Sequence, residues 1–164
     1  MDKLDRLDRF DWSILKSLEA DGRQTFSALA EEVGLSKTPC WSRVQALEQA
    51  GTIRGYKAVI DERSIGLDLV ALCEVQVQFS SHPAFEDAVK AHPAILECYT
   101  TAGEADYLLR VATSGVERLD LLLREELSQL PGVVRFATTI CLKRIKESGL
   151  IVGAAVLAGR QSKA

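Results

Sequence analysis

The sequence predicts an α+β protein: an N-terminal helix-turn-helix domain of winged-helix-like type, a strand linker, and a C-terminal ferredoxin-like βαββαβ domain. Two observations carry this prediction. Hydrophobic residues recur at spacings of three and four up to Gly51, which is the period of a helix. After Gly51, runs rich in β-branched and aromatic residues alternate with helical patterns. The predicted divisions are 1–51, 52–68, 69–147 and a tail at 148–164.

Three helices are expected in the first division, because each apolar pattern lies between a capping residue and a stop signal. The second and third helices are joined only by Gly34 and Leu35, so they must cross steeply. The inner face of the second helix is predicted to consist of Phe26, Leu29, Ala30 and Val33. The predicted caps are Asp8, Thr25 and Ser36, and the predicted stops are Asp21, Gly34 and Gly51.

The third division is predicted to hold four strands and two helices. Val75, Val77 and Phe79 alternate with polar residues, the pattern of a half-buried strand. Helices on one face of such a sheet leave the other face to a partner or to solvent. We therefore expect these three apolar residues, or their neighbours in the strand, to pair with a second copy. The predicted strands are 69–79, 95–101, 107–112 and 133–146, and the predicted helices are 84–91 and 116–130.

Two segments join or follow these domains. Residues 52–60 are rich in β-branched and aromatic residues and are interpreted as a linking strand. The tail is apolar up to Ala158 and carries no turn or cap, so it either adds an edge strand to a partner or frays.

Composition bounds the class of protein. The chain is 47% hydrophobic and 26% charged, which is typical of a globular protein, and no apolar run is long enough for a membrane span. The start of the chain is charged with no apolar signal core, which favours a cytoplasmic location. Its four cysteines form no CxxC pair and lie among apolar neighbours, so reduced and buried thiols are expected.

The charge distribution indicates one basic surface on an acidic body. Residues 36–57 carry four basic side chains and one acidic one, whereas residues 61–164 carry 11 basic and 14 acidic side chains. Such a local patch is typical of a protein that contacts phosphate with one face.

The third helix carries the strongest functional pattern. Cys40, Val44 and Leu47 should face the core, which turns a tryptophan among hydroxyl and amide side chains outward. That face suits a helix laid in the major groove of double-stranded operator DNA, although Trp41 packing against another domain or subunit is the alternative. The predicted base readers are Thr38, Trp41, Ser42 and Gln45, and the predicted phosphate contacts are Lys37, Arg43, Arg54 and Lys57.

From about residue 7 to 147 the chain resembles the Lrp/AsnC (leucine-responsive/asparagine regulator) family. The matching pieces are LDRFDWSIL (7–15), DGR (21–23), LAEEVGLS (29–36), SRVQALEQAGTIRGY (42–56), GEADYLLRV (103–111) and LPGV (130–133). The resemblance implies that the third helix reads DNA and that homodimers assemble into octamers or similar discs. It also implies that the C-terminal domain binds an amino-acid effector, with no other cofactor.

A turn before Tyr107 is the predicted effector site. Exposed backbone N–H groups around Gly103 can hold a carboxylate, and Glu104 or Asp106 can accept hydrogen bonds from an ammonium group. The family's turn commonly reads Gly-Asp-aromatic-Asp-Tyr, so Glu104 and Ala105 depart from it, and the small Ala105 leaves room for a bulkier side chain than leucine. A plain structural hairpin is the alternative. The predicted residues are Thr100, Thr101, Gly103, Glu104, Ala105 and Asp106, with Val116, Thr138, Thr139 and Ile140 implied by the resemblance as the wall from a neighbouring subunit.

No catalytic motif is present. The sequence holds no phosphate-binding loop, dinucleotide fingerprint or nucleophile–base set, so an enzyme is not expected. His82 and His92 precede prolines and are interpreted as surface turn residues rather than metal ligands. The leading hypothesis is therefore a transcription regulator of amino-acid metabolism. An architectural DNA organiser without an effector and a metabolite-binding regulatory subunit with a decayed helix-turn-helix remain as alternatives.

Overall fold

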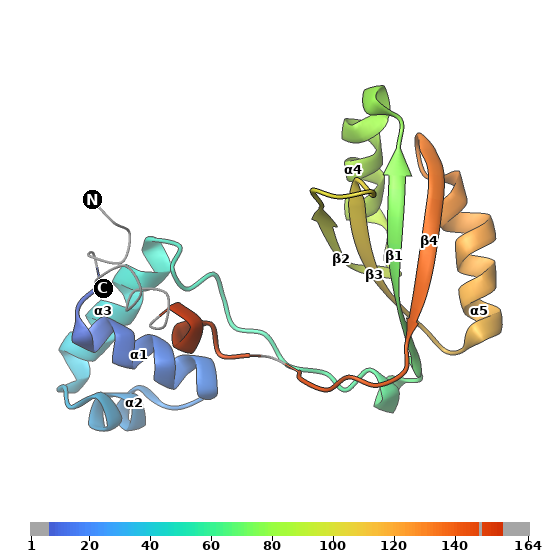
Figure 1. The fold of residues 1–164 in the computed structure, drawn as a ribbon. Helices are drawn as coiled ribbons and strands as arrows, with labels where there is room; N and C mark the ends of the chain where they lie inside the picture. Colours follow the sequence, from blue (N-terminus) through green and yellow to red (C-terminus); the bar gives the residue numbers. More distant parts are fainter. Residues whose placement is uncertain (1–6, 148, 156–164) are drawn as a thin grey trace, which may run out of the picture. The chain divides into compact units, whose positions relative to one another are not determined.

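The computed structural model describes residues 7–147 and 149–155, and these form two compact units (Figure 1). The first unit holds the described residues up to Val59 together with those from Lys146 onward. The second unit spans Ile60–Ile145. The C-terminal segment therefore belongs with the N-terminal helices, whereas the sequence predicted it as a separate tail.

Three helices form the first unit, as predicted: α1 (Arg9–Ala20), α2 (Phe26–Val33) and α3 (Lys37–Gln49). Asp8 caps α1 in a reciprocal arrangement, because its carboxylate accepts from the Asp11 N–H while the Asp11 carboxylate accepts from the Asp8 N–H. Thr25 caps α2 through a 3.2 Å bond from the Ala28 N–H.

Gly34 makes the turn between α2 and α3. Its φ of +73° lies in the left-handed region that favours glycine, and the Leu35 N–H returns to the Ala30 carbonyl at 2.8 Å. Only three residues, 34–36, separate the last residue of α2 from the first residue of α3, which confirms the predicted helix-turn-helix. Ser36 occupies the N-cap position of α3, but its side chain makes no capping hydrogen bond.

The core of this unit forms where the three helices meet. It consists of residues at helical spacing, and Phe26 is not among them because its side chain, at the first position of α2, is 43% exposed. The polar side chains of Ser17 and Glu32 bond across α1 and α2 beside this core. The buried core residues are Ile14, Leu29, Ala30, Cys40, Val44 and Leu47.

The predicted strand at 52–60 is absent from the described chain. The N–H groups of Thr52 and Ile53 both bond to the Leu47 carbonyl, so the chain first closes the end of α3. Residues 54–60 then run exposed and make no strand pairing with any described segment. A β-rich composition favours extended backbone, but a strand exists only where a second strand pairs with it.

Unit two is built on a four-stranded antiparallel sheet of order β2-β3-β1-β4. A short 3₁₀ turn (Arg63–Ile65) precedes it. The chain order βαββαβ and this strand order are those of the predicted ferredoxin-like fold. The strands are β1 (Leu69–Val77), β2 (Ile95–Thr100), β3 (Tyr107–Thr113) and β4 (Val133–Cys141).

Three of these strands are shorter than predicted, β2 by one residue and the other two by more. β1 ends at Val77, and Phe79 instead begins a 3₁₀ turn (Phe79–Ser81) in which its side chain is 93% exposed. β4 ends at Cys141 rather than at residue 146, because its ladder with β1 stops where Val70 pairs with Cys141. Local alternation could not locate these ends, since each depends on the length of the partner strand.

The helices α4 (His82–Ala91) and α5 (Val116–Leu121) cover one face of the sheet (Figure 1). The predicted helix at 116–130 changes form along its length. After α5 the chain makes a π-helical turn (Leu122–Glu126) and a 3₁₀ turn (Leu127–Gln129). Because the π turn adds a residue, Leu122 and Leu127 both reach the same core although they lie five positions apart.

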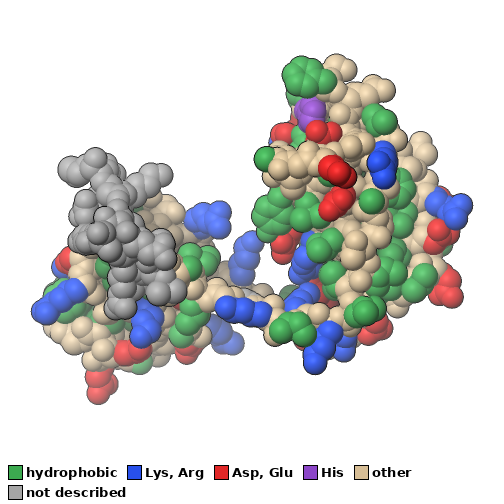
Figure 2. Space-filling view, in the orientation of Figure 1, with side chains coloured by type: hydrophobic (Ala, Val, Ile, Leu, Met, Phe, Trp, Pro, Cys, Tyr) green, Lys and Arg blue, Asp and Glu red, His purple; other side chains and the backbone are tan. Residues whose placement is uncertain are grey.

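The two faces of the sheet are different. Val75 and Val77 are 3% and 7% exposed and pack under the helices, so within β1 it is their neighbours, the stated alternative, that remain available to a second copy. Strand register places the alternate residues on the open face, over which hydrophobic and charged side chains are mixed (Figure 2). These open-face residues are Val70, Leu72, Glu74 and Gln76 of β1, Glu97 and Tyr99 of β2, Leu108, Arg110 and Ala112 of β3, and Arg135, Ala137 and Thr139 of β4.

The four cysteines differ in their burial. Cys40 and Cys73 are buried free thiols and Cys141 is half-buried, but Cys98 is exposed on the outer strand β2, so the expected burial of all four was wrong. No helix within residues 7–147 and 149–155 is long and apolar enough to cross a membrane. Among those same residues, no cluster of three or more histidine, cysteine or acidic side chains could hold a metal ion.

Candidate nucleic-acid interface and ligand-binding loop

The outward face of α3 presents the predicted base-reading side chains. Trp41 is 50% exposed, and Thr38 and Ser42 are exposed beside it. The opposite face carries Cys40 and Val44, which are fully buried. Since core packing fixes the rotation of the helix, the exposed face is presented rigidly, as groove recognition requires.

The side chain of Gln45, unlike those of Thr38 and Ser42, already makes a hydrogen bond within the described part of the protein. Its amide nitrogen donates to the Glu48 carboxylate at 2.8 Å, and the Tyr56 hydroxyl donates to the other oxygen of that carboxylate at 3.0 Å. Burial and this hydrogen bond to Glu48 raise the pKa of Tyr56. Gln45 must therefore exchange its bond to Glu48 for one to a base, whereas Thr38 and Ser42 need no such exchange.

Arg43 has partners inside the protein. One guanidinium nitrogen bonds the carboxylates of Asp8 and Asp11, each at 2.7 Å, and the guanidinium lies 5.4 Å from the Phe10 ring centre. The Asp11 N–H and the Arg43 guanidinium hold the pKa of Asp8 below its ordinary value. Arg43 thus ties α3 to the N-terminal end of α1, a role that the sequence did not reveal.

The other predicted phosphate contacts are exposed cations. Lys37 begins α3, while Arg54 and Lys57 lie on the segment that leaves it. None of these three side chains forms an ion pair with another described residue. Lys and Arg side chains are visible along the chain segments that leave the first unit (Figure 2). These cations have no described ion-pair partner to give up before they contact a phosphate backbone, whereas Arg43 already bonds two carboxylates.

The predicted ligand site is a six-residue loop, 101–106, between β2 and β3. Its two ends are joined to each other by the Thr101 N–H, which donates to the Asp106 carbonyl at 2.9 Å. The Asp106 N–H donates to the Val75 carbonyl at 3.0 Å and so ties the loop to β1. The Asp106 carboxylate accepts the Val77 N–H at 2.8 Å. The Gln76 amide reaches the Glu104 carbonyl at 2.6 Å.

The middle of this loop offers donors. Within the described chain, the N–H groups of residues 102–105 make no hydrogen bond. A Cβ added at Gly103 would meet nothing within 4 Å, so the space above the loop is open. Glu104 is exposed without a described partner, and Ala105 is half-buried. The loop therefore presents four adjacent donors beside one available carboxylate.

The residues predicted to form the opposite wall of the effector site do not lie beside this loop within a single chain. Val116 follows β3, at the end opposite to the loop, and is 61% exposed. Thr138 pairs with Cys73 in the middle of β1 and donates to its sulfur at 3.6 Å. Thr139 and Ile140 lie further along β4, which β1 and β3 separate from β2. Thr100 is exposed at the end of β2, next to the loop.

A polar network beside the loop was missed, since His82 was predicted as a plain surface residue. The Tyr107 hydroxyl donates to the Glu86 carboxylate at 2.9 Å, and His82 Nδ1 lies 2.7 Å from the same hydroxyl. Burial, then the hydrogen bond to Glu86, raises the pKa of Tyr107 to about 12. His92 is also structural, because it accepts the Ala94 N–H and lies 3.3 Å from the Glu126 carboxylate.

A second cluster lies where the chain enters and leaves the sheet unit. Glu62 accepts both terminal nitrogens of Arg110, at 3.0 and 2.7 Å, and Arg144 at 2.5 Å. Arg110 also approaches Glu97 at 3.4 Å. Because these residues are separated by up to 82 positions, no local pattern predicted the cluster.

Two family models match this chain. Residues 7–54 match the model of a winged helix-turn-helix DNA-binding domain, and residues 70–151 match that of the Lrp/AsnC ligand binding domain. A proline dehydrogenase transcriptional activator from Rhizobium radiobacter is 38% identical over 90% of this chain and 97% of its own length. The leucine-responsive regulatory protein of Escherichia coli K12 is 36% identical over 89% and 91%.

Solved structures agree with this match. A transcriptional regulator of Neisseria meningitidis, in complex with L-Met, superposes with a TM-score of 0.85 at 32% identity and covers 88% of this chain and 95% of its own. An AsnC family regulator from Agrobacterium tumefaciens superposes with a TM-score of 0.81 at 28% identity, covering 87% and 94%.

Proposed function

Because the chain belongs to the Lrp/AsnC family of DNA-binding transcription regulators, we propose that α3 reads an operator whose genes serve amino-acid metabolism. One observation carries the proposal: α3 buries Cys40 and Val44 and leaves Thr38, Trp41 and Ser42 exposed on a rigid face. Hydroxyl groups can bond base edges, and the indole can contact a thymine methyl group. The protein then acts in the cytoplasm, where its operator DNA lies.

Affinity and sequence choice are assigned to different side chains. Lys37, Arg54 and Lys57 contact phosphates, which supplies affinity for any DNA and makes binding depend on salt. Thr38 and Ser42 contact bases directly, and Gln45 does so after leaving Glu48. Arg43 acts by holding α3 against α1.

The effector is an α-amino acid bound at the loop 101–106. The four adjacent N–H groups of residues 102–105 bind its carboxylate, and Glu104 or the second oxygen of Asp106 accepts its ammonium group. A relative in this family is named for its response to leucine, and a neighbouring structure contains L-Met. These names favour an apolar side chain, which the open space at Gly103 and the small Ala105 would admit.

Assembly completes this site. The open face of the sheet carries Leu72, Leu108 and Tyr99, which bury apolar area when a second copy covers them. We assign the homodimer contact to this face and the octamer to association of four dimers. Val116 and the β4 residues Thr138, Thr139 and Ile140 then line the effector loop of a neighbouring subunit, since one chain leaves them apart.

A thermal-shift screen of the full-length protein against all proteinogenic amino acids tests the proposal, with sizing of the assembly in the same samples. A binding amino acid should raise the unfolding temperature with its concentration. The same amino acid should change operator affinity in fluorescence anisotropy. Steep salt dependence with little operator preference would instead identify an architectural DNA organiser. Failure to bind any DNA would indicate a decayed helix-turn-helix.

A further inference from the structure

We propose that residues 149–155 form a strap that docks on the outer face of α1 and couples β4 to the DNA-binding unit. Glu19 is the residue that anchors it. Docking itself is independent of the proposed function, whereas the regulatory consequence of docking rests on that function. The strap lies beyond the ferredoxin-like domain, and most of it lies beyond the residues that match the ligand-binding family model.

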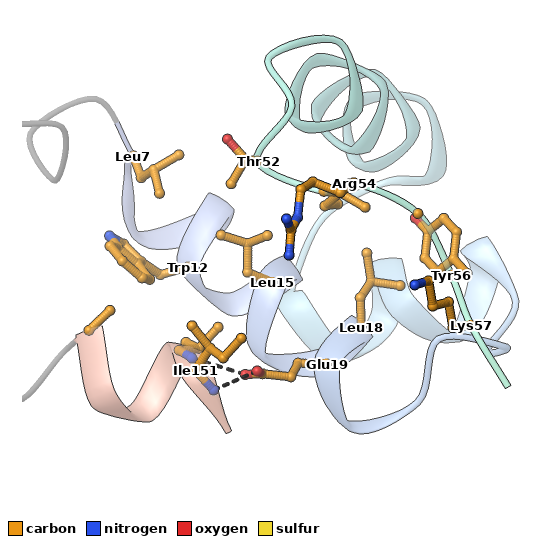
Figure 3. Close-up of a pocket in the computed structure, with 14 residues that line it drawn as sticks. Leu7, Trp12, Leu15, Leu18, Glu19, Thr52, Arg54, Tyr56, Lys57 and Ile151 are labelled. Carbon is orange, nitrogen blue, oxygen red and sulfur yellow. Dashed lines mark hydrogen bonds between the residues drawn. The ribbon is translucent and has the colours of Figure 1, made fainter. Parts of the chain in front are cut away.

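The first argument is the hydrogen bonding at Glu19. Residues 151–155 are helical, and the first N–H groups of a helix have no acceptor within that helix. Both oxygens of the Glu19 carboxylate meet this need, because they accept the Ile151 N–H at 2.5 Å and the Val152 N–H at 3.0 Å (Figure 3). A negative charge at a helix N-terminus is also favoured by the helix dipole. Glu19 therefore supplies the cap that the strap sequence itself lacks.

Apolar contact provides the second argument. Val152 and Ala155 lie three positions apart on one face of the strap and are half-buried, whereas Gly153 and Ala154 are exposed. With α1 and the segment after α3, the strap encloses a groove of about 710 Å³. Figure 3 shows side chains of α1 facing the strap across this groove. The α1 residues that line it are Trp12, Leu15, Leu18 and Glu19.

Chain connectivity gives the strap its consequence. Without the docked strap, only the segment after α3 would join the two units. With it, the chain that leaves β4 is also held to the first unit. This second connection begins at β4, directly after the candidate effector residues Thr138, Thr139 and Ile140. Near its start, Arg144 bonds Glu62, so the outgoing and incoming segments are held to each other.

The groove also includes candidate DNA contacts. Arg54 and Lys57 line it together with the strap residues Ile151 and Val152. A shift of β4 on effector binding would therefore pull on the strap, and the strap would move the segment that carries these cations. This is a physical link between two sites that a single flexible linker would leave uncoupled.

Two substitutions and two matched controls test the strap in the full-length protein. Glu19→Ala removes the anchor, and Glu31→Ala removes an exposed glutamate from the neighbouring α2 with no described side-chain partner. Val152→Asp places a charge on the docked face, and Ala154→Asp places it on the exposed face of the same short helix. Hydrogen exchange reports docking through the amides of Ile151 and Val152. Anisotropy reports the ratio of operator Kd with and without the amino acid found by thermal shift.

Both test variants should lose protection at Ile151 and Val152, and both controls should keep it. The effector-dependent change in operator Kd, about 5- to 150-fold in typical coupled systems, should fall toward one in the test variants and persist in the controls. Unchanged protection in Glu19→Ala and Val152→Asp would overturn the docking. If the test variants lose amide protection but keep the full effector-dependent change in operator Kd, the regulatory role is overturned. If no amino acid changes the operator Kd of the parent, the proposed effector response fails, while the exchange result still decides the docking.

Discussion

The Asp106 carboxylate accepts a hydrogen bond from the Val77 backbone N–H at 2.8 Å. Val77 is the last residue of β1. The ladder between β1 and β3 ends two residues earlier, where Val75 pairs with Tyr107. The side chain of Asp106 thus extends the ladder by one bond and holds the effector loop to the sheet. Asp106 therefore positions the loop. The neighbouring loop amides make the proposed contact to the effector carboxylate.

Replacing Asp106 with alanine should therefore affect both stability and effector binding. The N–H of Val77, a buried residue, would lose its acceptor, which costs about 1–3 kcal/mol in the free energy of unfolding. Urea unfolding measures that loss, and calorimetry should show weaker effector binding because the loop is no longer held.

Glu104→Ala is the control, since Glu104 is exposed without a described partner. It should leave the free energy of unfolding unchanged and weaken effector binding through loss of an ammonium acceptor. Equal effector affinity in the parent and both variants would place the pocket elsewhere.

On the recognition helix, Ser42→Ala should change the preference among operator sequences. A lost base contact costs about 1–3 kcal/mol for the sequence that made it and little for the others. Anisotropy against a set of operators with single base changes measures this discrimination. An unchanged ranking of operators would exclude Ser42 as a base reader.

Lys37→Ala should act differently, because a phosphate contact carries no sequence information. Binding should weaken for all DNA, and the slope of log K against log salt concentration should flatten by about one. A changed operator ranking with an unchanged slope would contradict this assignment.

Arg43→Ala should lower stability as well as DNA affinity, since Arg43 bonds Asp8 and Asp11. The lowered pKa of Asp8 means that its carboxylate stabilises the fold above its ordinary pKa of about 4 and that this contribution is lost as pH falls below it. The difference in unfolding temperature between parent and variant should therefore shrink below pH 4 or so. Equal unfolding temperatures at neutral pH would show that the ion pairs contribute nothing.

Tyr107 should make the protein less stable in alkali. Its pKa is raised to about 12, above the ordinary value near 10, so the folded state holds the proton more tightly than the unfolded state. The contribution of Tyr107 to the free energy of unfolding is fully present below about pH 10 and is lost as pH rises from about 10 to about 12. Urea unfolding at several alkaline pH values should show a weaker pH dependence in Tyr107→Phe than in the parent, where Tyr56 and Tyr99 have raised pKa values too.

Leu72→Glu should prevent dimer formation, because it places a charge at the centre of the open sheet face. Sedimentation should then report a smaller mass than the parent at equal concentration. Ala84→Glu is the control, since Ala84 is exposed on α4. A parental mass for Leu72→Glu would show that the subunits meet through another surface.

The sequence alone determined the features that depend on near neighbours. The caps at Asp8 and Thr25 and the turn at Gly34 follow from contacts three or four residues apart, so their residue types were sufficient to predict them. The outward face of α3 follows from helical periodicity, and the βαββαβ order follows from alternating patterns along the chain.

Tertiary structure decided whatever needed a distant partner. The β-rich segment 52–60 pairs with no described strand, and Phe79 lies past the end of β1, because strand pairing and strand ends depend on neighbouring strands. Arg43 bonds Asp11 across 32 positions of sequence, and Glu19 bonds the strap across 132. No local sequence pattern could reveal either contact at these separations. Local chemistry specified the elements and the faces they expose, whereas long-range packing decided which charged side chains remain available for a ligand and which already have partners.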